Sequence, residues 1–201
     1  ATCEAISHVA SKTSLVPIGM GIGPFSLMTK LVKDPITPVF LAGTGMTGEE
    51  EPEVAVVEKC LEAGTELILS YLSAQADAGA KAIIVCEPAA NLVYFSPNQL
   101  EEGFEIFDRY VMSPMRRIKK LLDDKGVDLI FHDCGELTNG MVSRFSTLHP
   151  AMMSLGCSRS LWEDAALVPK TPVLYGNRPT KKFYSPQLTV ADVESLSREL
   201  L

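Results

Sequence analysis

Short apolar runs alternate with longer segments of helical periodicity along most of this chain, and this alternation most constrains its fold. A parallel sheet whose strands are joined by crossover helices produces such a pattern, so the sequence predicts an α/β fold. Turns that favour helix termination precede three of the apolar runs, as expected for loops that lead from a helix into a strand. The expected strands are residues 15–19, 81–86, 127–131, 151–155 and 172–175.

Two long helices are expected between these strands. Residues 53–78 carry apolar side chains at helical spacing, and Gly64 is a position where this helix can bend. A second helix is predicted to begin at Pro97, because proline in the first helical turn lacks only an N–H group that would be unpaired there. Basic residues at 116–120 suit the end of that same helix, where cations interact favourably with the helix dipole.

Size and charge exclude several classes of protein. With 201 residues, 46% of them hydrophobic, the chain can bury one sizeable core, and a single domain over residues 1–201 is expected. The net charge of -7 argues against a broad basic surface for nucleic acid or anionic lipid. The longest uncharged stretch, residues 13–29, contains prolines and glycines and is short for a bilayer span, so no membrane segment is predicted.

The sequence also predicts a cytoplasmic, reducing environment. Its first residues do not combine a basic start, an apolar stretch and a small-residue cleavage site, so export is not expected. The cysteines are odd in number and widely spaced, in a chain too large to depend on disulfides. We therefore expect reduced thiols, some of them candidates for metal ligands. The five cysteines are Cys3, Cys60, Cys86, Cys134 and Cys157.

A glycine-rich segment, residues 43–48, matches the dinucleotide-binding pattern G-x-G-x-x-G and follows an apolar run. A pyrophosphate needs a helix N-terminus free of competing anions, whereas glutamates follow at 49–51 and Pro52 would fall inside the required helix. No second strand ends in an acid about 20 residues further on, where a ribose partner belongs. We therefore expect a flexible glycine loop at this position.

Chemically active side chains concentrate at the end of the run 127–131. On an extended segment, residues two apart point the same way, so His132 and Cys134 can converge on one ion while Asp133 faces elsewhere. Imidazole and thiolate suit Zn²⁺, and a catalytic zinc typically has three protein ligands and one open position. Two of the three are visible here. The alternative is an unreactive, buried cysteine beside a hydrogen-bonded histidine.

Three further residues follow other expected strands. Glu87 follows the run 81–86, and ligands of α/β sheets and barrels bind at this end of the strands. It could accept a hydrogen bond, act as a base or complete a metal shell, or be an ordinary acid in the loop. Asn177 could contact substrate or form an Asx-turn. Cys157 is a further candidate metal ligand, although a cysteine at such a position is more commonly buried.

Five segments in the same order, from Pro17 to Pro179, resemble the uroporphyrinogen decarboxylase superfamily, which implies a (β/α)8 barrel. They are PIGMGIGPF (17–25), QADAGA (75–80), CEP to FSP (86–97), FHDCG (131–135) and YGNRP (175–179). Within the superfamily, the H-x-C motif is similar to that of the zinc-dependent cobalamin:thiol methyltransferases that methylate coenzyme M. His132 and Cys134 match the first two zinc ligands of that branch.

The chain also departs from this pattern. The third zinc ligand of the methyltransferases, a cysteine at the end of their last strand, has no counterpart, nor do the arginine and aspartate motifs on the first strands of the decarboxylases. Five strands are expected where a full barrel of about 250 residues has eight. We therefore expect a single, incomplete TIM-barrel domain with about five βα units. Such a chain is either a fragment or a reduced protein that closes its sheet through a partner, including a second copy of itself.

The resemblance implies an enzyme that transfers a methyl group from a methylated corrinoid to a small thiol with the help of Zn²⁺. The methyl donor would be free methylcobalamin or a corrinoid protein. In this reading His132 and Cys134 bind the metal, Glu87 is catalytic, and Asn177 and Arg178 bind substrate. A porphyrinogen decarboxylase would need several cationic groups, and only Arg178 is offered at a strand end. A non-catalytic scaffold subunit is the third alternative.

Overall fold

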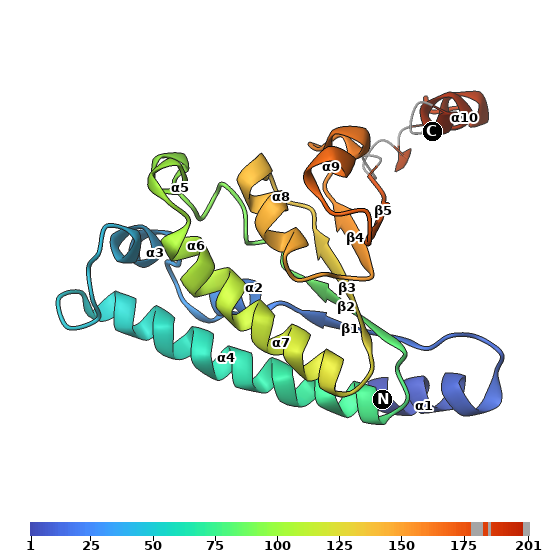
Figure 1. Ribbon diagram of the computed structural model, residues 1–201, viewed down its shortest axis with the longest axis horizontal. Helices are drawn as coiled ribbons and strands as arrows, with labels where there is room; N and C mark the ends of the chain where they lie inside the picture. Colours follow the sequence, from blue (N-terminus) through green and yellow to red (C-terminus); the bar gives the residue numbers. More distant parts are fainter. Residues whose placement is uncertain (178–182, 185, 199–201) are drawn as a thin grey trace.

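Five parallel strands form one sheet in the computed structural model, which describes residues 1–177, 183–184 and 186–198 (Figure 1). They pair in the order β1-β2-β3-β4-β5, so neighbours in sequence are neighbours in the sheet. This is the repeating unit of a (β/α)8 barrel, and within the described residues the sheet is open. The predicted α/β class is confirmed. The strands are β1 (Ile18–Ile22), β2 (Ala82–Cys86), β3 (Asp128–Asp133), β4 (Met152–Leu155) and β5 (Val173–Tyr175).

Helices connect the strands and cover one face of the sheet (Figure 1). The long helix α4 packs on β1 and β2, while α7 packs on β3 and lies beside α4. Right-handed crossovers between successive parallel strands place the helices on the same face. The helices among the described residues are α1 (Thr2–Lys12), α2 (Pro24–Leu31), α3 (Ile36–Gly43), α4 (Pro52–Asp77), α5 (Pro97–Glu102), α6 (Glu105–Phe107), α7 (Ser113–Asp124), α8 (Asn139–Ser146), α9 (Leu161–Leu167) and α10 (Val190–Arg198).

The two faces of the sheet differ in exposure. Val85 of β2 and Phe131 of β3 are completely buried on the helix side. On the opposite side, Ile18 and Met20 of β1 are 50% and 58% exposed, and Val173 of β5 is 58% exposed. We call this side the open face. It would be the inner face of a closed barrel, because the helices of such a barrel form its outer ring.

A chain of phenylalanine rings joins the helices and loops near the carboxyl ends of the strands. Phe25 of α2 contacts Phe95, which contacts Phe107, with ring centroids 5.0 and 5.1 Å apart. Phe107 in turn contacts Phe145 of α8 at 5.4 Å, and Phe145 lies 4.3 Å from Phe131 of β3. All five rings are almost completely buried. This core fixes the segments that follow β1, β2 and β3 relative to one another.

Strand β1 begins three residues later than predicted. The expected strand 15–19 rested on apolar Leu15 and Val16, but both are largely exposed and precede the sheet. The strand continues to Ile22 through two glycines that let α4 pack closely against it. A side chain at Gly19 would collide with Gln75 of α4, and one at Gly21 would collide with Leu72. The other four predicted strands are found within two residues of their expected ends.

The expectation of one helix from residue 97 to about 120 was wrong. α5 ends at Glu102, where Gly103 adopts a φ of 153° that interrupts the helix. Beyond α6, residues Asp108–Met112 form a π-helical turn before α7 begins at Ser113. Pro114 in the first turn of α7 has no N–H group, so the hydrogen bonding of a continuous α-helix is interrupted here. The wider π-helical turn lies directly before this interruption.

Residues 44–48 of the glycine-rich segment form a loop, as predicted, and Gly43 is the last residue of the preceding helix. The apolar run before it is part of α3 rather than the strand that a dinucleotide site requires, and α3 ends at Gly43. Pro52 occupies the first turn of α4. This loop therefore joins two helices, and the geometry of a phosphate-binding strand-turn-helix is not formed here.

Candidate metal and substrate site

The carboxyl ends of the strands bring one row of side chains together. In the strand register, Ile22 pairs with Cys86, Cys86 with His132, His132 with Ser154, and Ser154 with Tyr175. Paired residues of neighbouring parallel strands carry their side chains on the same face. The row follows Ile18 and Met20 in the alternation of β1, so it belongs to the open face. Cys86, His132 and Ser154 therefore lie side by side at the mouth of the sheet.

His132 is half-buried and has one ring nitrogen engaged. Its Nδ1 lies 3.1 Å from the Oγ of Ser154, which fixes the orientation of the ring. Burial lowers the pKa of the imidazole, which favours its neutral form. Neutral imidazole is the form that binds metals, and a metal-binding histidine usually has its second nitrogen held in this way.

Cys134 and Asp133 show the alternation that the sequence predicts. Cys134 is exposed, whereas the intervening Asp133 is completely buried. The Oδ1 of Asp133 accepts a hydrogen bond from the backbone N–H of Gly135 at 2.7 Å, while its Oδ2 has no partner within the described part of the chain. Burial raises the pKa of Asp133 well above its usual value. Asp133 therefore stabilises the turn after β3 rather than facing solvent. The side chains at this strand end that remain accessible to a metal ion are His132 and Cys134.

Glu87 holds the beginning of α2. Its carboxylate accepts hydrogen bonds from the backbone N–H groups of Phe25 at 3.2 Å and Ser26 at 2.5 Å, and it is completely buried. Burial raises its pKa to about 7, although these hydrogen bonds act in the opposite direction. A side chain at Gly23 would collide with this carboxylate, so glycine is needed there. The structure thus assigns Glu87 a structural contact, and its catalytic role stays a prediction.

Sequence reasoning did not single out Cys86 as a site residue. It lies in β2 directly beside His132 and is partly buried. Burial raises the pKa of its thiol, and electrostatic repulsion from Cys134 and Glu87 raises it further. The signal that could have found Cys86 is its place at the end of a strand, one residue before Glu87.

The remaining predicted residues lie around the ends of β4 and β5. The side-chain amide of Asn177 donates hydrogen bonds to the carbonyl oxygens of Gly156 at 3.0 Å and Arg159 at 2.6 Å. Asn177 therefore ties the end of β5 to the loop after β4, and its contact with substrate stays a prediction. Cys157 is exposed in that loop. Arg178 lies outside the described residues.

The chemistry of these donors suits two of the ligand positions of one zinc ion. His132 offers a held, neutral imidazole, and Cys134 offers an accessible sulfur from the same strand end. Across the described residues, no three histidine, cysteine, aspartate or glutamate side chains are already gathered closely enough to hold one metal ion. The third position of a zinc site is thus not preformed among these residues.

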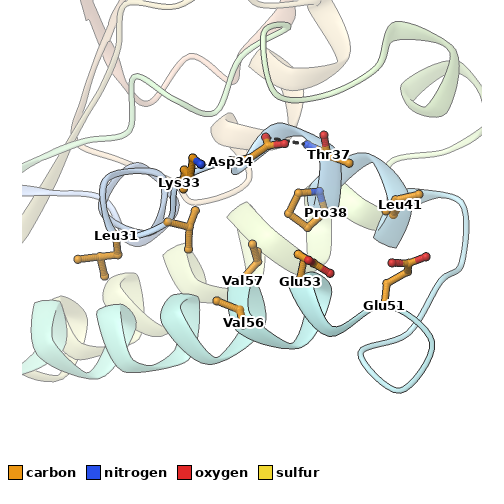
Figure 2. Close-up of a pocket in the computed structure, with 11 residues that line it drawn as sticks. Leu31, Lys33, Asp34, Thr37, Pro38, Leu41, Glu51, Glu53, Val56 and Val57 are labelled. Carbon is orange, nitrogen blue, oxygen red and sulfur yellow. Dashed lines mark hydrogen bonds between the residues drawn. The ribbon is translucent and has the colours of Figure 1, made fainter.

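A large cavity lies elsewhere. It measures about 690 Å³ and lies between α2, α3 and the start of α4 (Figure 2). Its lining combines apolar side chains such as Leu31, Leu41 and Val56 with the charged Lys33 and Glu53. None of the predicted site residues lines it. In the described ranges, no helix has both the length and the apolar character needed to cross a membrane.

Comparison with known proteins identifies the family. The model of the uroporphyrinogen decarboxylase (URO-D) family matches residues 1–194. A methylcobamide:CoM methyltransferase, MtbA, of Methanosarcina acetivorans is 28% identical over 140 residues, which cover 69% of this chain and 36% of that protein. MtbA of Methanosarcina mazei is 27% identical over 124 residues, which cover 62% of this chain and 32% of that protein.

A solved structure shows the same fold. A methyltransferase from Methanosarcina mazei superimposes with a TM-score of 0.71 at 18% identity, covering 99% of this chain and 54% of that chain. The chain thus spans about half of this structure, and the matched regions span about a third of the curated relatives. The resemblance to the superfamily, on the side of its methyltransferases, is confirmed. This chain belongs to the uroporphyrinogen decarboxylase family.

Proposed function

We propose that this protein transfers a methyl group from a methylated corrinoid to a thiol, at a zinc ion held by His132 and Cys134. The names of the two curated relatives support the reaction class. The observation that carries the proposal is the H-x-C motif at the carboxyl end of β3, where His132 is half-buried and Cys134 is exposed. Ligands of barrel enzymes bind at this end of the strands.

The residues around the motif have distinct tasks in this proposal. Bound zinc would lower the pKa of an acceptor thiol so that it is present as the more nucleophilic thiolate. Ser154 holds the ring of His132 through Nδ1, which would leave the other ring nitrogen available to the metal. Glu87 fixes the start of α2 beside the mouth. Asn177 positions the loop that carries Cys157 at the far side of the same mouth.

Metal analysis of the purified protein tests the proposal. We expect about one equivalent of zinc per chain by the stoichiometry of a catalytic zinc site, lost in His132→Ala and in Cys134→Ala. Cys60→Ala is the matched control, because Cys60 lies on α4, outside the strand ends. The zinc-loaded protein should then demethylate methylcobalamin in the presence of 2-mercaptoethanesulfonate, followed by the change in corrinoid absorbance. Zinc binding that survives both site variants would refute the proposal.

A non-catalytic scaffold is the second candidate. One observation favours it: no group of three metal donors is assembled among the described residues. A protein that neither retains zinc nor demethylates methylcobalamin would support the scaffold. Porphyrinogen decarboxylation is a third outcome of the same experiments. It is less favoured because Arg159, a cation near the end of β4, is already paired with Asp164.

A further inference from the structure

We propose that the cavity between α2, α3 and the start of α4 binds a small organic cation, an ammonium group carried on an apolar body. The cavity has a volume of about 690 Å³ (Figure 2). Sites for small molecules typically measure about 300–1,000 Å³. His132 and Cys134 do not line the cavity, so the inference is independent of the proposed zinc site and goes beyond methyl transfer.

Much of the lining is apolar and yet open to solvent. Leu31 at the end of α2 and Val56 of α4 are 56% and 51% exposed, and both line the cavity. Leu41 of α3 and the buried Val57 of α4 complete an apolar surface between the three helices (Figure 2). Contiguous exposed apolar surface in a concave place is a mark of binding grooves. A hydrocarbon group in the cavity would remove this surface from water.

The charged side chains of the lining lie at two separate ends. Lys33 and Asp34 follow α2, whereas Glu51 and Glu53 lie at the start of α4 (Figure 2). The Oδ1 of Asp34 accepts a hydrogen bond from the backbone N–H of Ile36 at 2.9 Å, at the beginning of α3. Lys33 and Asp34 have opposite charges, so the excess negative charge of the cavity comes from the two glutamates.

Glu51 and Glu53 are the groups that would bind the ammonium. The glutamates further along α4, at positions 58, 62 and 66, are paired with arginines. Within the described ranges, Glu51 and Glu53 have no such cation. Their place at the N-terminus of α4, where the helix dipole favours anions, explains how two like charges are tolerated together. A ligand ammonium would supply the missing counter-charge, while its apolar body covers the neighbouring Val56.

Calorimetric titration of the purified protein with three ligands of equal chain length tests the charge preference. Octylammonium should bind about fivefold or more tightly than octanol, a modest factor because partly exposed ion pairs contribute little each. Octanoate should bind most weakly. Added salt should reduce the preference for octylammonium, since interactions of exposed charges are screened. Equal affinities for the three ligands, or tighter binding of octanoate, would overturn the assignment of a cation.

Val56→Trp tests whether the ligand occupies this cavity. The indole should fill the apolar part of the lining and abolish the binding of octylammonium and of octanol. Leu67→Trp is the matched control, because Leu67 is also exposed on α4 but does not line the cavity. Circular dichroism should show that both variants are folded. Octylammonium binding that survives Val56→Trp would show that the ligand binds elsewhere, and the inference would fail.

Replacing both glutamates tests the ammonium site itself. The double variant Glu51→Gln and Glu53→Gln should lose the preference for octylammonium and bind octanol as before. Glu49→Gln is the control, because Glu49 is exposed in the preceding loop and does not line the cavity. A preference that persists in the double variant would refute the role of these carboxylates. Zinc binding should be unchanged in all variants, so a failure of the zinc site would overturn only the proposed function.

Discussion

Ser26 and Glu87 are held together at the mouth of the sheet, where the backbone N–H of Ser26 donates to a carboxylate oxygen of Glu87 at 2.5 Å. The hydroxyl of the same serine accepts a hydrogen bond from the backbone N–H of Ala89 at 2.9 Å. The first turn of α2 is therefore fastened to the segment that follows β2. Because Cys86 immediately precedes Glu87, this contact also sets where the last residue of β2 lies.

Ser26→Ala should destabilise the protein by about 1–3 kcal/mol. The substitution leaves the buried N–H of Ala89 without its partner, and an unpaired buried donor costs its full desolvation free energy. Denaturant unfolding monitored by circular dichroism measures the effect. Ser11→Ala is the control, because Ser11 is exposed on α1 and its hydroxyl bonds only within that helix. Equal stability losses in the two variants would show that the Ser26 contact contributes nothing specific.

The stability of the metal-free protein should decrease as the pH rises from 4.5 to about 7, the range between the ordinary and the folded-state pKa of Glu87. In this range the folded state keeps a proton that the unfolded chain has released, so raising the pH favours unfolding. The full difference is on the order of 3 kcal/mol for a pKa raised by this amount. Asp133, whose pKa burial also raises, contributes with the same sign.

Glu87→Gln isolates the contribution of this one carboxyl group to the pH dependence. Glutamine is neutral throughout, so the variant should lack the decrease that belongs to residue 87 and keep the one that belongs to Asp133. Unfolding in urea at a series of pH values, with EDTA present throughout, provides the comparison. Parallel stability profiles for the two proteins would mean that Glu87 is already ionised in the folded state at low pH.

Ser154→Ala should weaken zinc binding by about 10- to 100-fold while leaving the stability of the metal-free protein nearly unchanged. The serine hydroxyl holds His132 through Nδ1, and the ring loses its fixed orientation without it. Competition with a chelator of known affinity measures the change. Ser146→Ala is a suitable control, because Ser146 is equally buried but bonds to a backbone carbonyl within α8. An unchanged zinc affinity in Ser154→Ala would show that this serine does not support metal binding.

The sequence predicted the strands and one strand-end motif because those features depend on local patterns. Alternation along β3 is enough to place His132 and Cys134 on one side and Asp133 on the other. The role of Glu87 depends on α2, whose N–H groups are more than 60 positions away in the sequence, and no local pattern reports that contact. The neighbourhood of Cys86 likewise requires the register between β2 and β3.

Breaking the ion pair between Arg159 and Asp164 should destabilise the loops around the ends of β3, β4 and β5. The side chains of Arg159 and Asp164 are only 12% and 0% exposed, and Arg159 also bonds to Leu137 and Asn139. Asp164→Ala leaves the buried guanidinium without its counter-charge, which costs about 3–5 kcal/mol. The exposed pair Lys120–Asp124 is the control, where Asp124→Ala should cost about 1 kcal/mol or less. Similar losses in chemical denaturation for both variants would contradict the expected burial of the Arg159 pair.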